Sequence, residues 1–549
     1  MTARARLVAW ARLSVRARPE VRTRLAAQIA WPLAAAWLAF PDMGRHAAHK
    51  AAFLILALAV AAWAWARPAR LLAAPGGRRL PFILSLLALG GATAAGMLAV
   101  SNFSNFDWGD IAYYLSSFRS SHGWLPGENA INGRPFLAQH SEFWCLPVGW
   151  LFRLAPGPFV VQAAQAGLVL AAWGIVRSWI KRIAQDEAWA EWLAFGFALS
   201  PCLIVPLLKG FHGAATALPF LALAATAYHD RRWRVFLPAL LGLMLAKEVF
   251  ALTAIGLGCL ALLQRRSWHW IVIPVTLGFA YGLFLRFWFF PHMLGDAGYF
   301  YAHLGEDWRA GLHRVLSPDS VRYAVAMVVA GGGAICLRSP YALLALPTLF
   351  LNVYLGGTFA SPAFHYVIEP AFWAFFAGIA SLAGPPRECD PARADGADPV
   401  GIDAAGASPV QGRAAVSFTA CLLLLALVPL RGLPLYLHHP YAASYRAALA
   451  RIPDGASLSS AVPVDDRLWK TNRWYWIHYG GEAWLWYTAD EACLSGRYAL
   501  LPLVPGPMSM FDAGEQARIG DCLARLRADT GYTEIWTDGT LTLLRRRSD

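Results

Sequence analysis

Hydrophobic residues fill long stretches of this 549-residue chain, and short polar clusters separate them. A helix that crosses a bilayer needs roughly 20 apolar residues, and fewer where it is short or surrounded by protein. The pattern predicts an all-α polytopic transmembrane bundle of about 13 spans. The predicted spans are residues 26–40, 51–66, 80–100, 158–176, 188–208, 212–228, 235–246, 249–263, 268–290, 321–337, 341–356, 364–383 and 414–430.

Two apolar stretches are too short for full crossings. The neighbouring segments 235–246 and 249–263 predict a bent or partly re-entrant hairpin. Segment 143–155 is apolar as well, and we expect it to enter the membrane without crossing it.

The polar loop 101–145 interrupts the apolar pattern. It carries Asp107, Asp110, Glu128, His140 and Glu142, together with Arg119, Arg134 and many aromatic residues. After Asp110, the apolar residues 111, 114, 115 and 118 recur at helical spacing. This spacing predicts a short helix that lies at the membrane surface.

The composition supports a membrane protein. The chain is 57% hydrophobic and 15% charged, with a mean hydropathy of +0.42, whereas a soluble protein carries about 25% charged residues. The net charge of +13 does not indicate nucleic-acid binding, because the Lys and Arg residues lie in short clusters between apolar runs. The eight cysteines include no CxxC pair, which argues against a zinc site.

The basic clusters predict the orientation of the chain. They occur at residues 4–24, 67–79, 177–182, 231–234 and 265–266 and at Arg338, and each marks a cytoplasmic helix end under the positive-inside rule. This assignment predicts a cytoplasmic N-terminus. It also predicts that loop 101–145, residues 209–212, loop 291–320 and the region around His365 face the outside.

Five regions follow from this reading. Residues 1–25 form a cytoplasmic basic tail, and residues 26–384 form the transmembrane domain with its outer loop 101–145. Residues 385–413 are rich in Pro, Gly, Ala and Asp, which predicts a disordered cytoplasmic linker. Residues 414–430 are the last transmembrane helix, and residues 431–549 form a small extracytoplasmic α/β domain.

Local patterns predict the elements of this last domain. Helices are expected at residues 442–452 and 513–529, and a strand at residues 456–462. Two further strands flank Asp538-Gly539, a strong hairpin signal. Cys493 and Cys522 lie in this domain, and the sequence leaves open whether they form a disulfide.

Asp107 and Asp110 are the first candidates for chemistry. One reading is a helix start, in which Ser104 caps the helix and Asp107 belongs to its first turn. The functional reading is a general base, or ligands of a divalent cation that holds an anionic substrate. A divalent cation is the cofactor that this pattern suggests, with Asp107 and Asp110 as candidate ligands.

Four other sites combine polar residues with positions at the outer side or at membrane depth. They are His140 with Glu142, Phe211 with His212, the pair Lys247 and Glu248, and the group Ser361, His365, Tyr366 and Glu369. Each histidine has a structural alternative, either as a solvated loop residue or as a residue packed at a helix turn. Charged residues at membrane depth are costly and mark functional sites, so Lys247 and Glu248 are the stronger candidates.

These motifs resemble the bacterial membrane protein family DUF2079. Phe106-Asp107, His140, Phe211-His212, Lys247-Glu248 and His365-Tyr366 occur in the order and spacing of that family, and the motifs at residues 452–455 and 466–468 extend the similarity over residues 100–470. The family is similar to the GT-C superfamily of polytopic glycosyltransferases, which take sugars from polyprenyl-phosphate carriers and use acidic residues of the first outer loop.

The resemblance implies a GT-C-like bundle in the bacterial cytoplasmic (inner) membrane, with Asp107 in the catalytic position. The Asp-x-x-Asp spacing departs from the adjacent or acid-x-acid pairs of many GT-C enzymes, which leaves the role of Asp110 open. The expected partners are membrane lipids and a polyprenyl-phosphate sugar, with no nucleic acid and an acceptor that the sequence does not identify.

The functional hypothesis is therefore a glycosyltransferase with a lipid-linked donor. Asp107 would deprotonate the acceptor, and the leaving phosphate would bind a set of side chains in the loop and helix ends. That set comprises His140, His212, Lys247, Glu248, His365, Tyr366, Arg119 and Arg134. The alternatives are a lipid or solute transporter or flippase, in which Lys247 and Glu248 line a pathway, and a non-catalytic scaffold of the cell envelope.

Overall fold

The structure of this protein is a computed structural model. It describes residues 79–101, 110–121, 125–131, 133–184, 187–294, 308–361, 364–383, 442–460, 473–476, 489–503, 513–529 and 531–547. The predicted basic tail, the spans 26–40, 51–66 and 414–430, the linker 385–413 and Asp107 all lie outside these residues.

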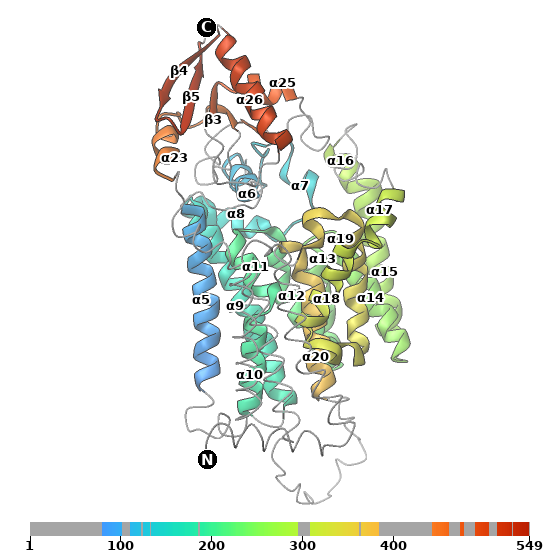
Figure 1. Cartoon of the computed structure of the whole chain (residues 1–549). Helices are drawn as coiled ribbons and strands as arrows, with labels where there is room; N and C mark the ends of the chain where they lie inside the picture. The colour runs from blue at the N-terminus through green and yellow to red at the C-terminus, as the bar shows by residue number, and fades with distance from the viewer. Residues whose placement is uncertain are drawn as a thin grey trace, which may run out of the picture.

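The described part of the chain up to residue 383 is helical (Figure 1). Its helices are α5 (Arg79–Ser101), α6 (Asp110–Arg119), α7 (Phe136–Gln139), α8 (Cys145–Leu154), α9 (Pro158–Ile183), α10 (Glu187–Ala198), α11 (Pro201–Lys209), α12 (Leu218–His229), α13 (Trp233–Met244), α14 (Phe250–Leu263), α15 (Trp268–Phe284), α16 (Phe290–Leu294), α17 (Trp308–Val315), α18 (Pro318–Ala330), α19 (Leu346–Leu355) and α20 (Ile368–Ala383). Shorter helical turns join them: η2 (Gly213–Ala217), η3 (Leu285–Phe289), η6 (Gly333–Arg338), η7 (Pro340–Ala345), η8 (Gly357–Ala360) and η9 (His365–Val367).

The helices match the predicted apolar segments, but many of them are short. Within the described residues, three continuous helices are long and apolar enough to cross a membrane, namely α5, α9 and the run Trp268–Leu294. The pair α10 and α11, bent by 41°, adds a fourth if it counts as one span. Proline explains part of this segmentation, because it lacks the N–H that continues a helix. Pro201 opens α11 and Pro340 opens η7.

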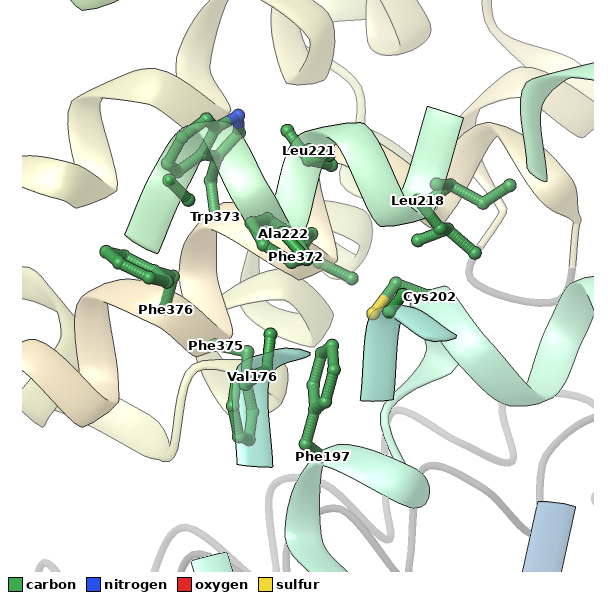
Figure 2. Packing of buried hydrophobic residues seen from close by; sticks show 14 of the residues in the cluster. Val176, Phe197, Cys202, Leu218, Leu221, Ala222, Phe372, Trp373, Phe375 and Phe376 are labelled. Atoms are coloured by element: carbon green, nitrogen blue, oxygen red, sulfur yellow. The ribbon is translucent and has the colours of Figure 1, made fainter. Parts of the chain in front are cut away.

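One large apolar core holds the bundle together. Aromatic residues of α20 pack against α9, α10 and α12, and Trp179 stacks on Phe376 with ring centroids 4.3 Å apart. Figure 2 shows part of this core, where Phe197 and Phe375 lie beside Val176. Such close packing of rings and small residues provides the dispersion contacts that associate helices in lipid.

The predicted surface helix exists but lies in a different environment. In α6, every residue from Ile111 to Phe118 is buried. The hydroxyl of Ser117 donates to the Tyr113 carbonyl, and the Ser116 hydroxyl accepts from the backbone N–H of Ala130. The interpretation as a membrane-surface helix is therefore wrong, because protein covers both faces and satisfies the polar one.

The C-terminal region is a small α/β unit at one end of the bundle, above α6, α7 and α8 in Figure 1. It contains α23 (Ala442–Leu449), β1 (Ser457–Ser460), β2 (Arg473–Trp476), α25 (Ala489–Leu494), β3 (Tyr498–Pro502), α26 (Ala513–Ala528), β4 (Tyr532–Thr537) and β5 (Leu541–Arg546). The strand order is β2-β1-β3-β5-β4, in which β1 is parallel to both of its neighbours and the other pairings are antiparallel.

The sequence pattern predicted the hairpin of β4 and β5, but it did not predict β2 and β3. Gly539 has a φ of +83°, and the Asp538 carboxylate accepts from the backbone N–H groups of Thr540 and Leu541, both at 2.9 Å. A disulfide joins Cys493 of α25 to Cys522 of α26. The sequence alone left open whether these two cysteines pair, and in the structure they do.

The α/β unit shares a core with the outer loop. Tyr445, Leu458 and Leu543 belong to the same buried cluster as Phe118 and Phe136. The Arg446 guanidinium donates to the carbonyl of Ser101 at 3.0 Å. The unit is thereby fixed onto the end of the bundle that carries the outer loop.

Candidate functional site

The turn between α13 and α14 holds the end of the outer loop. Nδ1 of His140 lies 2.6 Å from Oε1 of Glu248. The backbone N–H of Ser141 donates to the other oxygen of Glu248 at 3.2 Å, and the Tyr281 hydroxyl donates to the Ser141 hydroxyl at 3.2 Å. Residues 108 positions apart in the sequence therefore form one charge-assisted contact.

The neighbouring residue makes a second ion pair with the same loop. Nζ of Lys247 lies 3.4 Å from Oε1 of Glu142, whose side chain is fully buried. The Tyr114 hydroxyl donates to Oε2 of Glu142 at 2.9 Å and accepts from the backbone N–H of Gly213, also at 2.9 Å. This network joins α6, the outer loop, the start of η2 and the α13–α14 turn.

Two further hydrogen bonds to backbone carbonyls reinforce these contacts, which together form a clamp around the α13–α14 turn. The N–H of Phe143 donates to the carbonyl of Leu245 at 3.0 Å, and the Trp144 indole donates to the carbonyl of Gly242 at 2.7 Å. Lys247 and Glu248 reach separate partners because they occupy a turn between helices and not a helix.

Two histidines stack beside this clamp. The rings of His212 and His365 have centroids 3.9 Å apart and an interplanar angle of 28°. Gln165 fixes the first of them, since its side-chain oxygen accepts from the His212 backbone N–H at 2.7 Å. Tyr366 packs against the second, with centroids 4.0 Å apart.

A cavity of about 470 Å³ opens between these groups. His140, Lys247, Glu248, His365 and Tyr366 all contribute to its lining. Apolar side chains form most of the remaining wall, namely Val249, Phe250, Leu252, Leu351, Leu355, Phe359 and Ile368. A mostly apolar cavity with a few converging polar groups is the usual form of a small-molecule or lipid site.

A buried carboxylate also faces this cavity. Glu369, the second residue of α20, is 4% exposed. Its oxygens accept hydrogen bonds from the hydroxyls of Thr253 and Thr348, the latter at 2.7 Å. In the sequence its only signal was a spacing of four residues from His365.

The structure brings some of the predicted site residues together and leaves others apart. Five of them line the cavity, namely His140, Lys247, Glu248, His365 and Tyr366. His212 stacks on the ring of His365. Arg119 is exposed at the end of α6 and Arg134 lies in the turn before α7, and neither belongs to the cavity lining. Asp110 begins α6, and Asp107 lies outside the described residues.

Whether the protein holds a divalent cation depends on Asp107, which lies outside the described residues. No group of three or more His, Cys, Asp or Glu side chains within the described ranges is arranged to hold a metal ion. Asp107 lies outside these ranges, so the suggested cation site at Asp107 and Asp110 stays a prediction.

Two residues of this network had no role assigned to them from the sequence: Glu142, which was noted only beside His140, and Tyr114. Glu142 stood out as a charged residue just before an apolar run, but nothing in the sequence indicated that it would bind Lys247. Tyr114 was assigned to the apolar face of a surface helix, and the structure uses its hydroxyl as a link between Glu142 and Gly213.

Comparison with solved structures gives two matches to one protein. ArnT from Cupriavidus metallidurans bound to undecaprenyl phosphate superposes with a TM-score of 0.55 at 12% identity, covering 86% of this chain and 98% of that one. The apo structure of the same protein gives a TM-score of 0.50 at 13% identity, with coverages of 80% and 92%. The comparison with curated proteins gave no match.

These observations define a polytopic membrane protein with a fold similar to the GT-C glycosyltransferases. The sequence profile of the predicted membrane protein family DUF2079 matches residues 109–386, and the chain belongs to that family. The match confirms the resemblance drawn from the motifs, although the motifs at residues 106–107, 452–455 and 466–468 lie outside it.

Proposed function

We propose that this protein is an integral-membrane glycosyltransferase that takes its sugar from a polyprenyl-phosphate donor. The observation that carries the proposal is the cavity, which combines cationic and imidazole side chains with apolar walls in a fold similar to that of ArnT bound to undecaprenyl phosphate. A lipid phosphate needs an apolar surface for its chain and N–H donors for its anionic group.

The reaction assigns a role to each group. The acceptor oxygen forms a bond to the anomeric carbon of the sugar while the bond from that carbon to the phosphate oxygen breaks. Asp107 takes the acceptor proton as general base, and Asp110 is secondary. The lipid phosphate leaves as an anion, and Lys247 with His140, His212 and His365 stabilises its charge.

The proposal also includes the orientation of the protein in the membrane. Near the end of the bundle opposite the cavity, Arg182 pairs with Asp230 at 3.0 Å and Arg266 donates to the carbonyl of Tyr228 at 2.5 Å. With these basic residues at the cytoplasmic side of a bacterial inner membrane, the cavity and the C-terminal unit face outward. The disulfide between Cys493 and Cys522 suits an oxidising extracytoplasmic compartment.

The transport alternative requires a polar path through the bundle. In the described residues, the aromatic core around Trp179, Phe372 and Phe376 lies between the cavity groups and the Arg182–Asp230 pair. This apolar barrier supports a cavity that opens at one side, which is the arrangement that a transferase needs. The scaffold alternative gives no reason for a cavity lined by Lys247, Glu248 and His365.

The test is sugar transfer by membranes from a polyprenyl-phosphate sugar pool. A general base contributes typically 10²–10⁴-fold to rate, so Asp107→Asn is expected to lose about that factor while the protein still inserts. Asp110→Asn serves as the matched comparison and is expected to lose less. Asn caps a helix about as well as Asp, so full activity of the Asp107 variant at equal protein level would return Asp107 to a capping role.

A further inference from the structure

The cavity carries polar groups at two places. Around the α13–α14 turn it is lined by Lys247, by the paired His140 and Glu248, and by His365 from η9, where the lysine supplies positive charge and the imidazole rings can supply N–H groups. On α19 and at the start of α20 it is lined by Thr348, Asn352 and Glu369. The second group is not used by the phosphate chemistry proposed above.

The second group has already used its hydrogen-bond donors. The Thr348 hydroxyl donates to Oε2 of Glu369 at 2.7 Å, and the Thr253 hydroxyl donates to Oε1. The Asn352 side-chain nitrogen donates to the Tyr323 hydroxyl and to the Tyr366 carbonyl, both at 2.9 Å. A hydroxyl has one hydrogen to donate and an amide nitrogen has two. What remains for a ligand is acceptor capacity on the carboxylate, the amide oxygen and the threonine oxygen.

Burial makes this acceptor capacity significant. Glu369 is 4% exposed, Asn352 3% and Thr348 5%. A carboxylate accepts about four hydrogen bonds, and two threonine hydroxyls donate to the Glu369 carboxylate, so acceptor capacity remains. A buried carboxylate is costly unless donors surround it, so a ligand that brings donors completes the site.

The two groups border one cavity of about 470 Å³. His365 of η9 and Glu369 of α20 are four residues apart, and both line it. One ligand that combines a phosphate with a sugar ring can therefore contact both groups inside this cavity.

We propose that Glu369, Thr348 and Asn352 form a hydroxyl-binding subsite that recognises the sugar ring of the donor. The inference rests on the proposed function and deepens it. The N–H groups at the turn bind the phosphate, and the acceptor groups bind sugar hydroxyls. Selectivity for the sugar is therefore set by an acceptor-only surface, which penalises sugars that lack a hydroxyl at the contacted position.

The experiment compares a bare lipid phosphate with its glycosylated forms on the full-length protein in detergent. The probes are undecaprenyl phosphate and its glucose, galactose, mannose and arabinose esters, and the measurement is the Kd from tryptophan fluorescence. At least one ester is expected to bind wild type roughly tenfold more tightly than undecaprenyl phosphate, as one charge-assisted hydrogen bond provides. Glu369→Gln is expected to remove that difference and to leave the Kd of undecaprenyl phosphate unchanged.

Thr348→Val is the second variant, and it decides the result if Glu369→Gln does not fold. It removes a donor to Glu369 and is expected to reduce the same difference. Thr226→Val is the matched control, because Thr226 is a buried threonine of α12 that bonds to the Ala222 carbonyl at 2.8 Å and does not line the cavity. The control is expected to bind every probe as wild type does.

Two outcomes would overturn the subsite. One is that no ester binds more tightly than undecaprenyl phosphate, and the other is that the difference persists in the Glu369 and Thr348 variants. A failure of the proposed function looks different. Undecaprenyl phosphate itself would then bind weakly, and Lys247→Gln would not change its Kd.

Discussion

The two ends of the helical bundle both contain ion pairs, yet they use them differently. At the cavity end, Lys247–Glu142 and His140–Glu248 join segments about a hundred residues apart and border a cavity. At the opposite end, Arg177–Glu191 and Arg182–Asp230 join the ends of neighbouring helices. The first set builds a site, whereas the second fastens helix ends at the boundary of the apolar core.

The degree of burial follows this division only in part, because the Glu191 side chain at the opposite end is also buried, at 4% exposure. The Glu142 side chain is fully buried and Lys247 is 12% exposed, whereas Arg182 is 50% exposed. A buried pair is costly to assemble and costly to break, and an exposed pair contributes little to stability. The fully buried carboxylate of Glu142 borders the cavity, whereas the most exposed of these pairs, Arg182–Asp230, lies at the opposite end.

The largest expected difference between the ends is the compartment they face. Reporter fusions after residue 400 and after residue 549 are expected to report opposite compartments, because the predicted span 414–430 separates them. Alkaline phosphatase activity measures this as an all-or-none signal. The same signal from both fusions would contradict the assignment of that span.

Next in size is the removal of the fully buried carboxylate. Glu142→Gln removes the buried carboxylate that pairs with Lys247 and accepts from Tyr114, so it is expected to lower the free energy of unfolding by about 3–5 kcal/mol. Sugar transfer is expected to fall as well, since Lys247 loses its position. Thermal unfolding in detergent and the transfer assay measure the two effects.

Glu191→Gln is the control at the opposite end. It removes the partner of Arg177 and is expected to cost about 1.5–3 kcal/mol, while the transfer rate per folded molecule stays at the wild-type level. Equal loss of transfer in both variants would remove the functional distinction between the ends.

A smaller loss of stability than in Glu142→Gln is expected at the second ion pair beside the cavity, His140–Glu248. Glu248→Gln keeps one acceptor oxygen and loses the charge facing His140, so it is expected to cost about 1.5–3 kcal/mol of stability together with transfer activity. A double-mutant cycle with His140→Ala isolates the coupling of the pair. Normal expression with normal transfer in the single variant would exclude Glu248 from the site.

The smallest effect is expected at the exposed pair. Asp230→Asn removes the partner of Arg182 and is expected to change stability by about 0.2–1 kcal/mol, because solvent screens the pair. Transfer is expected to remain at the wild-type level. A loss of transfer here would show that the opposite end takes part in the reaction.

The sequence determined the helices and the identity of several site residues. Apolar runs of sufficient length can satisfy their backbone only as helices in lipid, so α5, α9 and α15 follow directly from composition. The order of the His140, Lys247 and His365 motifs was enough to identify the family. Asp538-Gly539 predicted its hairpin because few residues tolerate a positive φ.

Only the tertiary structure decided which charges meet. Period and propensity describe neighbours along the chain, and they carry no information about contacts such as Glu142 with Lys247 or Thr348 with Glu369. The burial of α6 is a second example. Its serine residues predict a solvent-exposed face, but in the structure the segment around Ala130 and the C-terminal unit cover the helix. A polar side chain looks the same in sequence whether water or protein satisfies it, and only the fold decides which of the two it meets.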